Sequence, residues 1–144
     1  MSLFVLDTDT FSLLLHGHDE VSRRIVQADA HVLALTIITV EESLTGWYSQ
    51  VRRARRDDDI LEAYGALHRT FDFLRDLPVL PFDASAIQRF RDLRRLHRRR
   101  SGNDLRIAAI VMEHVGILVT RNQQDFSGIP GLNTEDWSKP LDEN

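Results

Sequence analysis

Hydrophobic residues in this chain occur in two patterns, short uninterrupted runs and longer stretches with helical spacing. Three runs, Leu3–Leu6, Val32–Thr36 and Ile117–Thr120, consist almost wholly of apolar and β-branched residues. Uninterrupted runs of this kind are typical of parallel strands that are buried on both faces. Because helical periodicity fills the segments between them, the pattern predicts an α/β fold: a three-layer α/β/α sandwich with a mainly parallel sheet of four or five strands.

The stretches between the runs predict helices. The longest begins at Asp57–Asp59, whose carboxylates suit a helix N-terminus, and its apolar residues recur mostly every three or four positions as far as Leu77. Asp83 is placed to cap a further amphipathic helix. The other elements expected are helices near residues 10–16 and 19–28, from residue 39 and over about 104–114, an extended segment at 78–82, and a final turn with an edge strand at 129–133.

The composition is that of one ordinary domain, residues 1–144, with 42% hydrophobic residues. The absence of cysteine excludes disulfides, thiolate metal sites and cysteine catalysis, and is compatible with a reducing compartment. The first apolar run ends at Asp7, and no stretch approaches the roughly 18 apolar residues of a membrane span. We therefore expect a cytoplasmic protein with neither a signal peptide nor a membrane contact.

Positive charge is distributed unevenly along the chain. The net charge is −4, yet between Arg89 and Arg100 there are seven arginines and a single acid, Asp92. Such a patch can bind phosphates even on an acidic protein. A charge run of this kind can equally be a solvated helix face, and the sequence leaves both interpretations open.

Four acidic residues lie where an apolar run ends or a helix begins. Asp7 follows the first strand, Asp125 lies beyond the third run, and Glu42 and Asp104 fall in the first turns of expected helices. In an open α/β sheet, ligands bind at the carboxyl ends of the strands. Their joint placement therefore predicts one common site.

Each of these acids also has a local explanation. Asp7 is a suitable helix cap, and Thr39–Glu42 matches a capping box, which Ser101–Asp104 matches more loosely. Asp125 lies where an Asx turn would account for it. Taken singly, each acid is explained better by local structure than by catalysis.

Four motifs follow one another along the chain: Leu6–Asp9, Thr36–Gly46, Asn103–Ala109 and Leu118–Phe126. Their order and spacing resemble the PIN-domain ribonucleases, specifically the VapC-like toxins of type II toxin–antitoxin systems. The resemblance spans nearly the whole chain and includes the closing Ile129–Leu132 and Trp137.

The resemblance implies a PIN-like fold and a set of site residues. It selects Glu42 rather than Glu41, because Glu42 stands four residues before Gly46. Asp9 lies where the family more often has asparagine, which adds a fifth acid whose role, metal ligand or supporting residue, stays open. Thr120 and Asn122 match family positions near the metal. The implied catalytic residues and metal ligands are Asp7, Glu42, Asp104 and Asp125.

Converging carboxylates repel one another, so that a bound cation or a raised pKa must relieve the repulsion. Hard oxygen ligands favour Mg²⁺ or Mn²⁺, and such an ion supports attack of water on a phosphodiester. The resemblance implies RNA as substrate, a small antitoxin protein as partner and a homodimer. We expect Arg98, Arg99 and Arg100 to bind the RNA backbone.

Two other functions are weighed against this one. The segment Phe4–Thr10 also looks like the first motif of haloacid-dehalogenase-type phosphatases, in which two aspartates act as nucleophile and acid/base. Those enzymes need a lysine near the site, and the single lysine here, Lys139, follows the last expected strand. The third interpretation, a catalytically silent binding module with the same fold, is opposed by the complete set of four acids.

Overall fold

A computed structural model of the chain describes residues 2–28 and 32–140. Strands and helices alternate along it, as the hydrophobic pattern predicts. The strands are β1 (Leu3–Leu6), β2 (Val32–Thr36), β3 (Val79–Leu80), β4 (Ile117–Val119) and β5 (Asn133–Glu135). The helices are α1 (Thr8–Leu15), α2 (Asp19–Gln27), α3 (Ile37–Arg53), α4 (Asp57–Asp76), α5 (Ala84–Leu96), α6 (Gly102–Glu113) and α7 (Gln123–Phe126).

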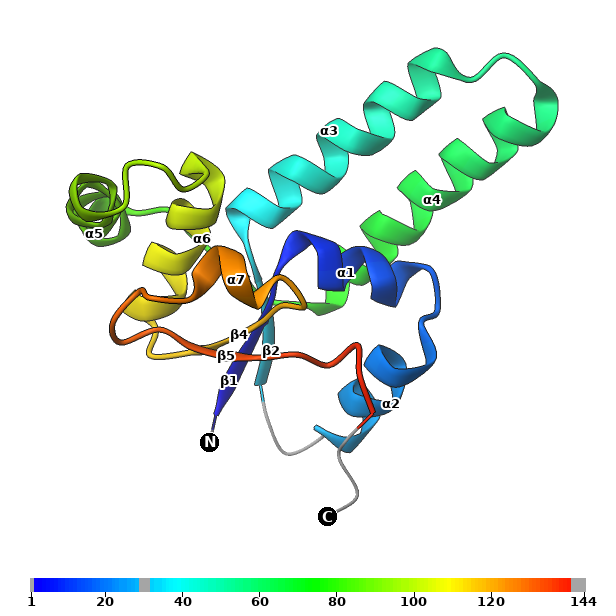
Figure 1. Cartoon of the computed structure of the whole chain (residues 1–144). Coiled ribbons are helices and arrows are strands. Elements are labelled where there is room, and N and C mark those ends of the chain that lie inside the picture. Colours follow the sequence, from blue (N-terminus) through cyan, green and yellow to red (C-terminus); the bar gives the residue numbers. More distant parts are fainter. Residues whose placement is uncertain (1, 29–31, 141–144) are drawn as a thin grey trace.

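The five strands form one parallel sheet in the order β3-β2-β1-β4-β5, which confirms the α/β prediction. The central strand β1 pairs with β2 through Leu3 and Val32 and with β4 through Phe4 and Ile117. Since all strands run the same way, their carboxyl ends meet at one edge of the sheet, here called the rim (Figure 1).

Helices cover both faces of the sheet, so that the predicted three-layer sandwich is confirmed. Val5 and Leu118 belong to a core cluster with the buried side chains of α5 and α6, whereas Phe4 and Leu6 belong to a second cluster with α1 and α2. This alternation follows from the strand geometry, in which successive side chains point to opposite faces. Burial on both faces is why the runs are uninterrupted in hydrophobicity.

Helices α3 and α4 form a hairpin that projects beyond the sheet (Figure 1). The predicted long helix is present, but much of its large apolar stripe is solvent-exposed. Leu61 and Tyr64 are exposed, whereas the buried positions of α4 are the small residues Ala63, Ala66 and Thr70. Small residues allow close helix packing, and the projection leaves the larger side chains without a sheet to cover them.

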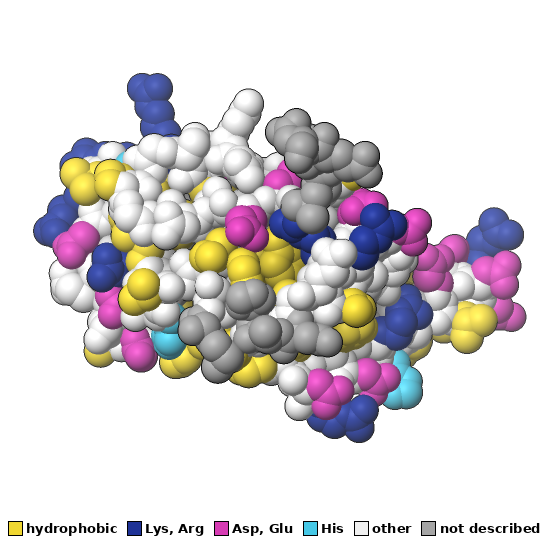
Figure 2. Space-filling view, turned by 90° about the horizontal axis from the view of Figure 1, so that it is seen from below, with side chains coloured by type: hydrophobic (Ala, Val, Ile, Leu, Met, Phe, Trp, Pro, Cys, Tyr) yellow, Lys and Arg dark blue, Asp and Glu magenta, His cyan; other side chains and the backbone are white. Residues whose placement is uncertain are grey.

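At the end of the sheet opposite the rim, hydrophobic side chains gather near the centre of the visible face (Figure 2).

Within the described residues, none of the helices is both long and apolar enough to cross a membrane.

Candidate active site

Asp7 lies at the junction of β1 and α1, buried with 5% of its surface exposed. Its Oδ1 accepts a hydrogen bond from the Thr10 amide at 2.7 Å, so it does cap α1. Burial raises the pKa of the Asp7 carboxyl, and hydrogen bonds from Thr120 and Thr10 oppose that rise. The capping role and a place at the rim therefore coexist in one residue.

Glu42 reaches the rim from α3. Its Oε1 accepts a hydrogen bond from the Thr8 hydroxyl at 2.7 Å, which links α3 to the first turn of α1. The interpretation of Thr39–Glu42 as a capping box is wrong, because α3 begins at Ile37. The helix is capped by the Thr36 hydroxyl, which accepts a hydrogen bond from the Thr39 amide at 3.2 Å. With the helix starting earlier, Glu42 lies in its second turn and cannot reach a cap.

Asp104 lies in the first turn of α6, which Ser101 caps weakly, with 3.5 Å between the Asp104 amide and the Ser101 hydroxyl. The pKa of Asp104 is raised to about 6, first by burial and then by the negative charges of Asp125, Glu42 and Asp7. The positive charge of Arg100 acts in the opposite direction. Three acids from three other segments of the chain therefore lie close enough to Asp104 for their charges to repel it.

Asp125 is exposed on α7, a one-turn helix that replaces the expected Asx turn. Arg100 holds this helix from outside. Its guanidinium donates to the carbonyl of Gln124 at 3.3 Å and also to the carbonyls of Asp125 and Ser127. Arg100 therefore fixes the backbone that carries Asp125, which the sequence did not indicate.

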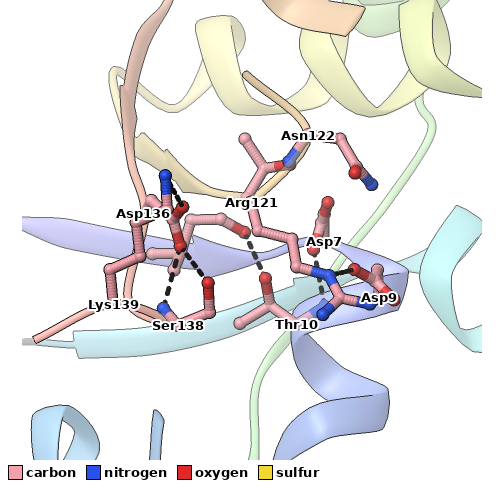
Figure 3. A network of polar contacts seen from close by, with 10 residues as sticks. Asp7, Asp9, Thr10, Arg121, Asn122, Asp136, Ser138 and Lys139 are labelled. Carbon is pink, nitrogen blue, oxygen red and sulfur yellow. Dashed lines mark hydrogen bonds and ion pairs between the residues drawn. The ribbon is translucent and has the colours of Figure 1, made fainter. Parts of the chain in front are cut away.

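The residues expected near the metal lie around Asp7. Thr120 is buried, hydrogen-bonds to Asp7, and accepts from the Asn122 amide at 3.0 Å through its hydroxyl. Asn122 is exposed and stands at the N-terminus of α7. Asp9 forms an ion pair with Arg121, as Figure 3 shows. This partner of Asp9 lies 112 residues away in sequence, and no local signal indicates it.

The donor set suits a hard cation in its chemistry, because the converging side chains are carboxylates. Within residues 2–28 and 32–140, however, no three His, Asp or Glu side chains are close enough together to hold a metal ion as they stand. Burial and the negative charges of the other three acids raise the pKa of Asp104, and the positive charge of Arg100 offsets only part of that rise. A cation at the centre would remove this repulsion and allow the carboxylates to approach.

The arginine patch separates into paired and unpaired side chains. Arg95 pairs with Asp92, and Arg94 donates to the Arg100 carbonyl at 3.0 Å. Arg98, which follows α5, lines a surface hollow of about 510 Å³ together with Phe90 and three arginines of α5. Among the described residues no hydrogen-bond or ion-pair partner is found for Arg98 or Arg99. Arg100 differs from its neighbours because it holds α7.

The family model for the PIN domain matches residues 4–132 of this chain. A search of curated proteins finds no significant match. Among solved structures, VapBC2 from Rickettsia felis bound to a promoter DNA fragment has a TM-score of 0.79 at 22% identity, covering 94% of this chain and 98% of that chain. VapBC from Salmonella typhimurium, also bound to DNA, has a TM-score of 0.78 at 24% identity, covering 95% and 99%. A toxin–antitoxin complex from Klebsiella pneumoniae has a TM-score of 0.69 at 25% identity, covering 98% and 100%.

Proposed function

The chain belongs to the PIN-domain family, and from this premise we propose that it is a divalent-metal-dependent ribonuclease that acts as the toxin of a toxin–antitoxin pair. The observation that carries the proposal is the raised pKa of Asp104, which the charges of three further acids help to produce. Acids whose pKa values are raised by burial and by neighbouring acids are typical of functional sites.

We propose Asp7, Glu42, Asp104 and Asp125 as the residues that hold Mg²⁺ or Mn²⁺. When bound, the ion would supply positive charge beside the scissile phosphate and lower the pKa of water. The protein's own contribution is positional. Thr120 orients Asp7 by a hydrogen bond, and Thr8 does the same for Glu42.

The RNA backbone would cross the surface of α5 and the loop that follows it. Arg98 and Arg99 are exposed cations without a described partner, as phosphate-binding side chains should be. The third predicted residue, Arg100, is proposed to act differently: it holds the segment that presents Asp125 and adds positive charge near Asp104.

We propose a small antitoxin as the partner, laid across the rim with a basic side chain directed at the acids. A hollow of about 170 Å³ between α1 and α3 supports this, because it is lined by Glu42 and by the apolar Leu15 and Trp47. An apolar anchor of the antitoxin would fit beside the site. The known structures that resemble this chain include toxin–antitoxin complexes, which supports a partner of this class. A homodimer and a cytoplasmic location belong to the same proposal.

The test is cleavage of a panel of structured RNAs with and without Mg²⁺ or Mn²⁺, comparing the wild type with Asp7→Asn. The proposal expects metal-dependent cutting that the variant loses. Folded wild-type protein that binds RNA but cuts none under any metal condition would instead favour the silent binding module. The phosphatase alternative is less well supported, because Asp9, which would be its acid/base, is held in an ion pair with Arg121.

A further inference from the structure

The ion pair between Asp9 and Arg121 is not explained by the four proposed metal ligands. Asp9 stands in the first turn of α1 and Arg121 follows β4, so the pair joins two segments beside Asp7 (Figure 3). The side chain of Arg121 is 47% exposed and that of Asp9 is 35% exposed. Ion pairs at such exposure add little to stability. The main effect of this one is to determine where the guanidinium lies.

The pair occupies one edge of the guanidinium and leaves another open. Arg121 faces Asp9 through Nε, which bonds Oδ2, and through Nη2, which donates to Oδ1 at 3.3 Å. Among the residues that the structure describes, none accepts a hydrogen bond from Nη1 of Arg121. Nη1 and the second N–H of Nη2 therefore form a free fork, the geometry that binds two phosphate oxygens together.

Arg121 also lines a hollow of about 570 Å³ that includes the proposed metal ligand Asp125. Residues 122–124, Asp136 and Lys139 also line this hollow. The ammonium group of Lys139 lies 4.0 Å from the carboxylate of Asp136, which offsets part of its charge. The guanidinium of Arg121, with its planar set of N–H donors, is therefore the better candidate for binding a phosphate. Amides and cations beside a cluster of acids suit a phosphodiester chain that continues past the bond being cut.

We propose that Arg121 is a substrate-binding residue that holds a phosphate of the RNA adjacent to the scissile bond, and that Asp9 is the residue that positions it. The inference rests on the proposed ribonuclease function and assigns Asp9 a role outside the metal ligands. It also explains how an acidic rim admits a polyanion, because a cation is anchored within reach of the acids.

The first test is equilibrium binding of a labelled single-stranded RNA in EDTA, where cleavage is prevented, over a range of salt concentrations. Arg121→Gln should raise Kd about tenfold and lower the salt slope by about one. The matched control is Arg23→Gln, which removes an arginine from another exposed pair, with Glu20 at 3.0 Å, on α2 near the opposite end of the sheet (Figure 1). Arg121→Lys retains the charge but not the fork, so it should restore the salt slope and only part of the affinity.

The second test separates positioning from metal binding. With Mg²⁺ present, Arg121→Gln should act mainly on KM, and its effect should shrink in an Asp9→Asn background because the guanidinium has already lost its anchor. Asp9→Asn itself should leave the metal concentration for half-maximal cleavage unchanged. A rise of about 10-fold or more in that concentration would make Asp9 a ligand and overturn its positioning role.

The outcomes distinguish this inference from the function on which it rests. Wild-type protein that binds and cuts RNA while Arg121→Gln matches Arg23→Gln in affinity and salt slope would overturn the inference alone. A wild type that neither binds nor cuts RNA would remove both. Because the pair is half-exposed, each variant is expected to keep the wild-type melting temperature, which is checked alongside.

Discussion

Replacing Asp104 by asparagine is expected to stabilise the metal-free protein at neutral pH. The pKa of Asp104 is raised from 3.8 to about 6, so the folded protein binds more protons than the unfolded chain between these values. The stability that protonation of Asp104 contributes is fully present below its unfolded pKa and is lost as the pH rises through its folded pKa. At neutral pH the folded state therefore carries a destabilising charge, which Asp104→Asn removes at nearly constant volume.

The size of the effect follows from the two pKa values. Full linkage between 3.8 and about 6 corresponds to about 3 kcal/mol, and solvent screening at this partly exposed group reduces it to about 1–2 kcal/mol. For a domain of this size, that is a rise in Tm of about 3–6 °C. At about pH 4.5 the gain should fall to about one third of its value at about pH 7.5, because Asp104 is then mostly protonated in the folded protein, which no longer carries the destabilising charge.

The assay is thermal unfolding in EDTA at both pH values, with Glu62→Gln on the exposed surface of α4 as the control. The control removes one negative charge away from the rim and should change Tm little. Adding Mg²⁺ should abolish the advantage of Asp104→Asn, since the wild type then gains stability from the bound ion. A variant that melts at or below the wild-type temperature in EDTA at neutral pH would refute the convergence of charges on which the site rests.

Three further predictions concern other residues of the site. Asp7→Asn and Asp7→Ala should both abolish cleavage. Only the alanine variant should lose about 1 kcal/mol of unfolding free energy in a denaturant titration, because it alone removes the cap of α1. Equal stability of the two variants would contradict the capping role. Replacing Arg98 and Arg99 together by glutamine should flatten the salt dependence of RNA binding with little change in Tm. An unchanged salt slope would return Arg98 and Arg99 to a solvated face. Arg100→Gln, in contrast, should lower Tm measurably, because three carbonyls around α7 lose the hydrogen bonds that the guanidinium donates. Induction of the chain alone should arrest growth, and co-expression of its antitoxin or the Asp7→Asn substitution should relieve the arrest; toxicity that persists in Asp7→Asn would remove the toxin proposal while leaving a nuclease possible.

Much of the backbone was predictable because its signals are local. The runs Leu3–Leu6 and Val32–Thr36 coincide with β1 and β2, and the acids from Asp57 mark the start of α4. Asp83 caps α5 as expected, with its Oδ1 accepting from the Ala86 amide at 3.0 Å. Strand formers, caps and periodicity each act within a few residues, so that each is legible in the sequence.

The errors occurred where two local signals compete or where a contact is distant. The sequence pattern predicts Thr39 as the cap of α3, whereas the hydroxyl of Thr36, three residues earlier, accepts a hydrogen bond from the Thr39 amide and caps the helix. The stripe of α4 predicts a buried face, yet Leu61 is exposed because the hairpin projects past the sheet. Periodicity shows that a helix has an apolar face, but not what covers that face.

By itself, the sequence determined the alternation of strands and helices and the places where acids end or begin an element. Only the tertiary structure decided how those acids meet, through the parallel register that brings the ends of β1, β2 and β4 to one rim. It alone paired Asp9 with Arg121, 112 residues away, and Arg100 with the backbone of α7. The physical reason is the sequence distance over which each interaction acts. Secondary structure arises from backbone groups that are close together in the sequence, whereas charges interact through space between residues that can be far apart in it.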